Sequence, residues 1–228
     1  MLSKDYILGL VEGEGCFNIG IGLHEPKCRR DVGKSFIKRP YIFSVKPSFH
    51  IALAIKDRTV LDKVAATIGH GKVYINKRAH QGKGWSDVAH YYVMGIEGSL
   101  KVVDFFKDIQ FETTKGEDFM LWCNCISLIQ KAVHGTKEGI IEIARLRDCM
   151  NNTKQATKRS PEELGELFEE KLIERRQKWL TFIHNNYSKI YPSTINSWKV
   201  LLQDDTVDLY SKEMLKLAIN GPKQAVLA

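Results

Sequence analysis

Two glycines set four residues apart in a helical pattern constrain the fold of this 228-residue chain more than any other feature. The stretch Ile7–Gly15 reads Ile-Leu-Gly-Leu-Val-Glu-Gly-Glu-Gly, and its apolar residues recur at helical spacing after Ser3, a suitable N-cap. Each glycine inside a helix costs about 1 kcal/mol relative to alanine. The spacing puts Gly9 and Gly13 on one helix face, where the missing side chains allow another helix to approach closely.

Two glutamates follow at the carboxyl end of the same helix. Glu12 and Glu14 lie where the helix macrodipole is negative, which is unfavourable for carboxylates without a cation. Pairing of two such helices would bring their carboxylates together, and a divalent cation held by oxygen ligands would offset the repulsion. A glycine turn with two exposed glutamates is the alternative interpretation of these residues taken alone.

The rest of the first 150 residues combines strand and helix patterns. Alternating apolar residues predict four strands: Cys16–Leu23, Tyr41–Ile55, Lys72–Asn76 and His90–Ile96. Helical spacing predicts five helices: Leu2–Glu12, Thr59–Ile68, Ser99–Phe106, Gly116–Val133 and Lys137–Met150. Pro47 marks an edge or a bulge of the second strand. Helices and strands in this order predict an α+β domain over residues 1–152.

A helical extension is expected over residues 153–228, after a polar stretch at 151–160. Ser160 and Pro161 predict the start of a helix over Pro161–Asn186, and Ser193–Leu217 is expected to hold two short helices. The extension has 12 basic and 10 acidic residues, so its charge is nearly balanced.

Composition excludes several classes of protein. Apolar residues make up 43% of the chain, enough to bury a core, and the apolar runs are too short for a membrane span. The five cysteines are odd in number and form no C-x-x-C pair, which disfavours a disulfide framework or a zinc knuckle. The first residues lack the features of a signal peptide. We therefore expect an intracellular protein, in the cytoplasm or nucleoid, or in an organelle if it is encoded there.

Positive charge is concentrated in the region of the predicted strands. Residues 16–83 contain 14 Lys and Arg but four Asp and Glu, a net charge of +10, whereas the whole chain carries +7. Such a block repels itself unless a polyanion neutralises it, and a phosphate backbone is the obvious polyanion. Lysines scattered over a solvated face are the alternative.

Several stretches of the sequence resemble those of a known family. Ile7–Gly15 is similar to the LAGLIDADG motif of homing endonucleases at every position, apart from Glu for Asp and Gly for Ala. Ile68–Tyr74 resembles the junction between a helix and the third strand in that family, and residues 105–151 resemble its second half. The resemblance covers about residues 1–152 and leaves 153–228 unmatched. An accessory DNA-binding element and a pair of helices that supports a dimer are equally compatible with the unmatched residues.

The resemblance implies an αββαββα domain with an antiparallel DNA-binding sheet. It also implies sequence-specific cleavage of both strands of a long DNA site, with Mg²⁺ as cofactor and Mn²⁺ or Ca²⁺ able to substitute. Because the chain contains one motif, the central pair of motif helices requires a homodimer and a near-palindromic target. A catalytically weak relative is the alternative function: a transcriptional regulator, or an intron maturase that binds host intron RNA. The retained Glu12 and Glu14 disfavour it.

Site residues follow from the same resemblance. Glu14 is implied as the catalytic acid and metal ligand, the Gly13 carbonyl as a second ligand, and Lys115 as a basic residue near the leaving group, with a solvated helix-capping lysine as the alternative for Lys115. The implied dimer interface contains Leu8, Gly9, Glu12 and Gly13. The candidate DNA-binding residues are Asn18, Arg29, Arg30, Lys34, Lys38, Arg39, Ser44, Lys46, Lys72, Asn76, Arg78 and Gln81.

One departure from the family pattern concerns the second strand. Members often carry a polar residue there that orients the attacking water, whereas residues 51–55 here are apolar throughout. His50, Lys56 and Arg58 are the candidate replacements, and the sequence does not choose among them.

Overall fold

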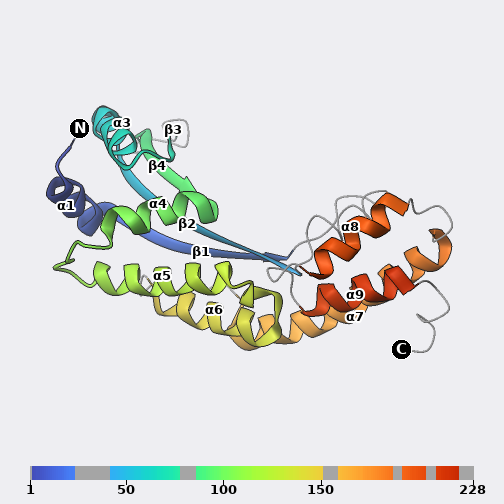
Figure 1. Ribbon diagram of the computed structural model, residues 1–228. Coiled ribbons are helices and arrows are strands. Elements are labelled where there is room, and N and C mark those ends of the chain that lie inside the picture. Colours follow the sequence, from blue (N-terminus) through green and yellow to red (C-terminus); the bar gives the residue numbers. More distant parts are fainter. Residues whose placement is uncertain are drawn as a thin grey trace. The chain divides into compact units, whose positions relative to one another are not determined.

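The computed structural model describes residues 2–23, 42–77, 86–150, 159–186, 192–203 and 209–220 (Figure 1). Within these residues the predicted α+β class is confirmed. The elements in chain order are α1 (Lys4–Glu14), β1 (Gly15–Leu23), β2 (Phe43–Ala54), η2 (Ile55–Asp57), α3 (Arg58–Ile68), β3 (Lys72–Asn76), β4 (Val88–Met94), α4 (Gly95–Phe106), α5 (Lys115–Gln130), η4 (Val133–Gly135), α6 (Lys137–Cys149), α7 (Pro161–Asn186), α8 (Pro192–Leu202) and α9 (Leu209–Asn220).

The first helix, expected over Leu2–Glu12, spans Lys4–Glu14, and α4 begins at Gly95 instead of Ser99. Two further predicted ends differ from the structure because the backbone turns where the apolar pattern continues. The strand expected to end at Ile96 ends at Met94, since Gly95 adopts φ 78° and α4 begins there. The helix expected to reach Val133 ends at Gln130, and Ala132 follows with φ 57° before the short 3₁₀ helix. A residue in the left-handed region interrupts a strand or a helix, as Gly95 and Ala132 do here. The apolar periodicity of the sequence does not predict where such a residue lies.

The four strands form one sheet in the order β1-β2-β4-β3. Strand β4 pairs antiparallel with both β2 and β3, so that Ile51 faces Tyr91 and Tyr74 faces His90. The β2–β4 register begins at Ser48, directly after Pro47. Proline lacks an N–H, and its place before the paired stretch is why an inner strand tolerates it here.

One face of the sheet is buried under helices. Phe17, Phe49 and Tyr91 are completely buried. Helix α5 runs below β1 in Figure 1, and the ring of Phe106 in α4 lies 6.4 Å from that of Phe49. The Phe17 ring lies 5.0 Å from Phe49 and 5.2 Å from Trp122 of α5, and the Trp122 indole N–H donates to the Asn18 carbonyl at 3.2 Å. These aromatic contacts fix α5 against β1.

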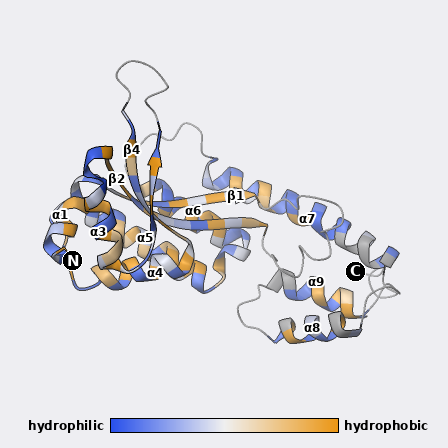
Figure 2. Cartoon of the chain, turned by 90° about the horizontal axis from the view of Figure 1, so that it is seen from above, coloured by the Kyte–Doolittle hydropathy of each residue, from blue (hydrophilic) through white to orange (hydrophobic). Residues whose placement is uncertain are grey.

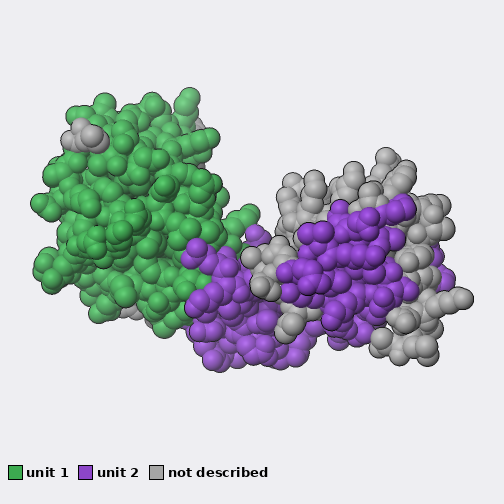
Figure 3. All heavy atoms as spheres, in the orientation of Figure 1, with its two compact units in different colours: residues 1–20, 45–127, 146–156 green, residues 21–44, 128–145, 157–228 purple. Residues whose placement is uncertain are grey.

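The chain divides into two compact units (Figure 3). Unit 1 comprises residues 1–20, 45–127 and 146–156, and unit 2 comprises 21–44, 128–145 and 157–228. The predicted boundary at residue 152 lies outside the described residues and stays a prediction.

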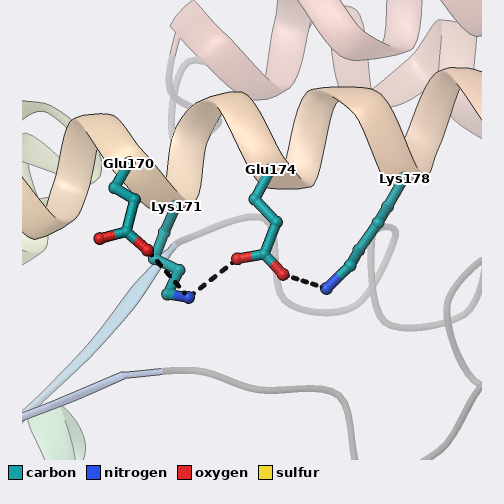
Figure 4. Close-up of polar contacts among 4 residues, drawn as sticks. All are labelled: Glu170, Lys171, Glu174 and Lys178. Carbon is teal, nitrogen blue, oxygen red and sulfur yellow. Dashed lines mark hydrogen bonds and ion pairs between the residues drawn. The ribbon is translucent and has the colours of Figure 1, made fainter.

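Helix α7 of unit 2 spans the predicted residues Pro161–Asn186. It opens with a capping box: Ser160 Oγ accepts from the Glu163 N–H at 3.1 Å, and Glu163 Oε2 accepts from the Ser160 N–H at 2.6 Å. Further along, Lys171 lies between Glu170 and Glu174, and Lys178 also pairs with Glu174 (Figure 4). The two lysines lower the Glu174 pKa to about 2. These ion pairs lie at the protein surface, so their contribution to stability is small.

Helices α8 and α9 confirm the two short helices predicted near the C-terminus. They pack against each other and bury Trp198, Met214 and Ala218. No described helix is long and apolar enough to cross a membrane, and hydrophilic residues recur along α7, the longest described helix, in Figure 2.

Candidate active site and nucleic-acid interface

Helix α1 buries one face and leaves its glycine face open. Ile7 and Val11 are completely buried, and the Ser3 hydroxyl accepts from the Tyr6 N–H as predicted for the N-cap. Gly9 and Gly13 are exposed, and a Cβ built on either would meet no atom within 4 Å. Packing inside the described chain therefore does not account for either glycine. Leu8, also predicted for the dimer interface, is half-buried.

The end of α1 presents an exposed carboxylate. Glu14 is the last residue of the helix, and no basic residue lies in the last turn. Gly15 has to follow it, because a Cβ there would lie 2.5 Å from the Val11 carbonyl oxygen. No hydrogen bond or ion pair engages Glu14 among the residues that the structure describes. The Gly13 carbonyl is one of the last four of the helix, which have no intrahelical donor.

Glu12 has a different environment from Glu14. Its Oε1 accepts from the Glu112 N–H at 2.6 Å and from the Thr113 N–H at 2.9 Å. Glu12 is half-buried, whereas Glu14 is exposed. The two glutamates of the motif are therefore not equivalent: one is engaged within the chain, and the other is available to a ligand.

Lys115 is the first residue of α5 and is largely buried. Its side chain is 20% exposed, and its Nζ lies 3.3 Å from Asp118 Oδ2, whose side chain is 15% exposed. This geometry disfavours a solvated helix-capping lysine. It leaves a positive charge of restricted mobility close to His50, since Lys115 contributes to lowering the pKa of that histidine.

His50 lies on the sheet face opposite the helices. Its ring stacks on Tyr92 at 5.6 Å and lies 6.4 Å from the ring of His90. Burial lowers the pKa of His50, and His90 and Lys115 lower it further. Its Nδ1 is buried and has no hydrogen-bond partner among the described residues.

The other two candidates for the second-strand polar role lie past the strand end. Lys56 is exposed in η2, and Arg58 in α3 pairs with Asp62 at 3.6 Å. Of the three residues that the sequence left open, His50 is the one on the sheet and in the electrostatic environment of Lys115.

Alternation in the strands defines an open face, opposite the buried one. Its side chains are exposed or half-buried apart from Ser48. The open face comprises Cys16, Asn18, Gly20, Gly22, Ser44, Lys46, Ser48, His50, Ala52, Ala54, Lys72, Tyr74, Asn76, Val88, His90, Tyr92 and Met94. No Asp or Glu occurs among these described residues, so the face offers polar and cationic groups without a carboxylate to repel a polyanion.

The described candidates for DNA binding all lie on the open face. They are Asn18, Ser44, Lys46, Lys72 and Asn76. The remaining candidates lie outside the described residues: Arg29, Arg30, Lys34, Lys38, Arg39, Arg78 and Gln81. Alternation alone could not say which face would be open, and the burial of Phe17 and Phe49 decides it.

Comparison with known proteins agrees with this geometry. The sequence profile of the LAGLIDADG endonuclease family matches residues 7–126, more than half of the chain. The chain belongs to that family. The matched region contains Glu14, Lys115 and all four strands, and α6 to α9 lie beyond it.

Two relatives illustrate the extent of the similarity to LAGLIDADG proteins. A probable intron-encoded DNA endonuclease of Mycosarcoma maydis is 31% identical over 121 residues, 53% of this chain and 35% of that protein. The homing endonuclease I-TnaI has a crystal structure that matches with a TM-score of 0.55 and 26% identity, over 74% of this chain and 97% of that one. The chain thus spans about a third of the length of the curated relative.

A third comparison concerns chain length within the same fold. I-SmaMI, crystallised on its uncleaved DNA target with calcium ions, matches with a TM-score of 0.55 and 20% identity. The match covers 74% of this chain but 49% of the I-SmaMI chain. One copy of this LAGLIDADG fold therefore corresponds to half of that longer chain.

Sequence reasoning missed three aromatic residues on the open face: Tyr74, His90 and Tyr92. All three belong to β3 and β4, and Tyr74 is 55% exposed. The signal was present in the sequence, since positions 90 and 92 alternate with the apolar positions 91 and 93. None of the three is a lysine or arginine, and the predicted DNA-binding residues were mainly lysines and arginines.

Proposed function

We propose that this chain is a sequence-specific homing endonuclease that makes a metal-dependent double-strand break in a long, near-palindromic DNA site. The observation that carries the proposal is the exposed carboxylate of Glu14, which ends a helix whose glycine face is open. A carboxylate at the negative end of a helix, with no cation in the last turn, is poised for a metal ion.

DNA binding is supported by the character of the open face. Lysines, histidines and small polar residues lie on adjacent strands, and none of the described residues of the face is acidic. A two-stranded or wider β-ribbon fits the major groove of B-DNA, where side chains read base edges. We expect Lys46 and Lys72 to contact phosphate and Asn18 and Asn76 to contact bases.

A homodimer is supported by the glycine face of α1. Gly9 and Gly13 cost the isolated helix about 2 kcal/mol in total relative to alanine, and no contact in the described chain compensates for it. Close approach of a second α1 would make use of both glycines. The dimer would have twofold symmetry, which requires an approximately palindromic site.

The donor set of the chain fits half of a metal site. The Glu14 carboxylate and the Gly13 carbonyl would hold the ion, as oxygen ligands suited to Mg²⁺, Mn²⁺ or Ca²⁺. The described residues contain no cluster of three His, Cys, Asp or Glu, so we expect two copies to contribute jointly. When bound, the ion stabilises the charge that develops on the scissile phosphate.

Two further side chains would act beside Glu14. Neutral His50 is half-buried on the open face and has a lowered pKa, which suit it to accept a hydrogen bond from the attacking water near neutral pH. Lys115, held by Asp118, would place positive charge close to the leaving oxygen. This assigns the missing polar role of the second strand to His50.

The proposal is tested by incubating the purified chain with a randomised double-stranded DNA library, in Mg²⁺ and in EDTA, and sequencing the new ends. We expect Mg²⁺-dependent ends on both strands of one near-palindromic sequence. Selection of one DNA sequence without cutting would indicate a regulator, and selection of RNA in a parallel library would indicate a maturase. Either result would contradict the endonuclease.

A further inference from the structure

The first glutamate of the motif holds a segment that is 100 residues away in the sequence. Glu12 Oε1 accepts from the N–H groups of Glu112 and Thr113, at 2.6 and 2.9 Å. Both amides belong to the connection between α4 and α5 (residues 107–114). One carboxylate oxygen thus satisfies two backbone donors of a connection that is otherwise exposed at this point.

The held segment leads directly into the first turn of α5. The Thr113 hydroxyl accepts from the Lys115 N–H at 3.3 Å, and the Thr113 carbonyl accepts from the Gly116 N–H at 3.0 Å. Helix N-termini present unsatisfied N–H groups and a positive dipole end, so a carboxylate there is favourable. Glu12 therefore holds the backbone directly before α5, and the first residue of α5 is Lys115.

A second anchor keeps the same connection in place independently. The Phe111 ring lies 5.2 Å from Phe119 and 5.6 Å from Phe106, inside the aromatic core. Gly116 packs on Phe111 so closely that a Cβ would lie 2.8 Å from the phenylalanine Cβ. Loss of the Glu12 contacts should therefore loosen residues 112–115 without unfolding the domain.

Spacing along α1 separates the tasks of the two glutamates. Residues two apart on a helix point about 200° away from each other. Glu12 accordingly reaches the α4–α5 connection, and Glu14 is directed elsewhere and is exposed.

We propose that Glu12 is a positioning residue for Lys115, acting through the amides of Glu112 and Thr113, and not a metal ligand. The inference rests on the proposed endonuclease function, because Lys115 has a task only if the phosphodiester bond is cut. Its physical basis is geometric: a displacement of about 1 Å of a group near the reacting atoms can cost about 10²-fold in rate.

The test compares Glu12→Gln with Glu12→Ala in single-turnover cleavage of the selected DNA site. The glutamine amide oxygen accepts the same two hydrogen bonds, whereas alanine accepts none. We expect Glu12→Ala to lower the rate at saturating DNA about 10- to 100-fold, with the Kd for DNA within about threefold of wild type. Glu12→Gln should recover most of that loss, and the Mg²⁺ concentration for half-maximal rate should stay constant.

A double-mutant cycle shows whether the effect passes through Lys115. In the Lys115→Met background, Glu12→Ala should lower the rate by less than about twofold, since the residue to be positioned is gone. Losses that multiply, or a glutamine variant as slow as the alanine variant with a raised Mg²⁺ requirement, would overturn the proposal. The second result would make Glu12 a metal ligand.

Amide hydrogen exchange gives a readout that needs neither DNA nor metal. Glu12→Ala should raise exchange at Glu112 and Thr113, while amides in β2 stay protected as in wild type. Unchanged exchange at 112–113 would overturn the proposal even in an active enzyme. A wild-type protein that cuts no DNA would overturn the proposed function, whereas an enzyme that cuts DNA but shows unchanged exchange at 112–113 in Glu12→Ala would overturn this inference alone. The two failures are therefore distinguishable.

Discussion

The buried and open faces of the sheet come from the same four strands but have opposite chemistry. On the buried face, Phe49 and Tyr91 are completely enclosed and each contributes to one aromatic core. On the open face, the neighbouring positions His50 and Tyr92 stack on each other and are half-buried. Core packing determines the first set. We expect the second set to contribute little to folding, and we attribute its polar and cationic character to what the sheet binds.

The largest expected effect on stability comes from Phe49 on the buried face. Phe49→Ala removes a ring that lies 5.0 Å from Phe17 and 6.4 Å from Phe106, and should lower the free energy of unfolding by about 3–5 kcal/mol. Lys46→Ala, three positions away on the open face, should change it by less than about 0.5 kcal/mol. Urea denaturation measures both. Equal losses of unfolding free energy in the two variants would mean that side chains of the open face also stabilise the fold.

The next effect concerns assembly. Gly9→Leu fills the open glycine face of α1 and should convert the proposed dimer to monomer, while the monomer keeps its helix content because no atom lies within 4 Å of the new Cβ. Ala66→Leu, at an exposed position of α3, is the matched control. Sedimentation at several concentrations measures the mass. A Gly9→Leu protein that still dimerises would place the interface elsewhere.

The pH dependence of cleavage should report His50. Its pKa is lowered from 6.5 by burial, His90 and Lys115, so the imidazole is neutral at pH 7 and becomes protonated only below its ordinary range. The cleavage rate should therefore hold from pH 8 down past 6.5 and fall in more acidic buffer. Single-turnover rates with saturating DNA measure it. His50→Gln should remove the acidic fall, and its persistence would assign the titration to another group.

The smallest effect is expected for single lysines of the open face. Lys72→Ala should weaken DNA binding similarly for all sequences and reduce the slope of log K against log salt by about 1, if one phosphate contact is lost. Lys63→Ala, at an exposed position of α3, makes the same charge change at a residue that is not part of the open face, and should leave the slope unaltered. Equal salt slopes for Lys72→Ala and Lys63→Ala would mean that Lys72 does not contact the DNA.

Much of the fold could be predicted from the sequence because its signals are local. Ser160 with Pro161 predicted the start of α7, and Gly69 with φ 76° ends α3 where the sequence placed the stop. The alternation of residues along the strands could not show which face of the sheet is open, because the side chains of both faces repeat every two residues. Which face is open is decided by long-range contacts such as that of Phe17 with Trp122.

The candidate site was predictable to a similar extent. The motif pointed to Glu14 as the catalytic acid and metal ligand, which stays a prediction, and the structure shows that this glutamate is exposed. The partners of Glu12 lie 100 residues away, and no local pattern connects them. The sequence left His50, Lys56 and Arg58 as candidates for the second-strand role, and the choice of His50 depends on its place on the sheet and on the electrostatic effect of Lys115.

Glu14 should be essential for DNA cleavage but not for folding or DNA recognition. Its most direct test is Glu14→Gln on the selected DNA site, with cleavage, binding and thermal unfolding measured on one preparation. We predict that cleavage falls at least about 10³-fold, while the Kd for DNA stays within about threefold and Tm is unchanged or slightly raised. Cleavage at the wild-type rate, or a loss of binding as large as the loss of cleavage, would contradict the account.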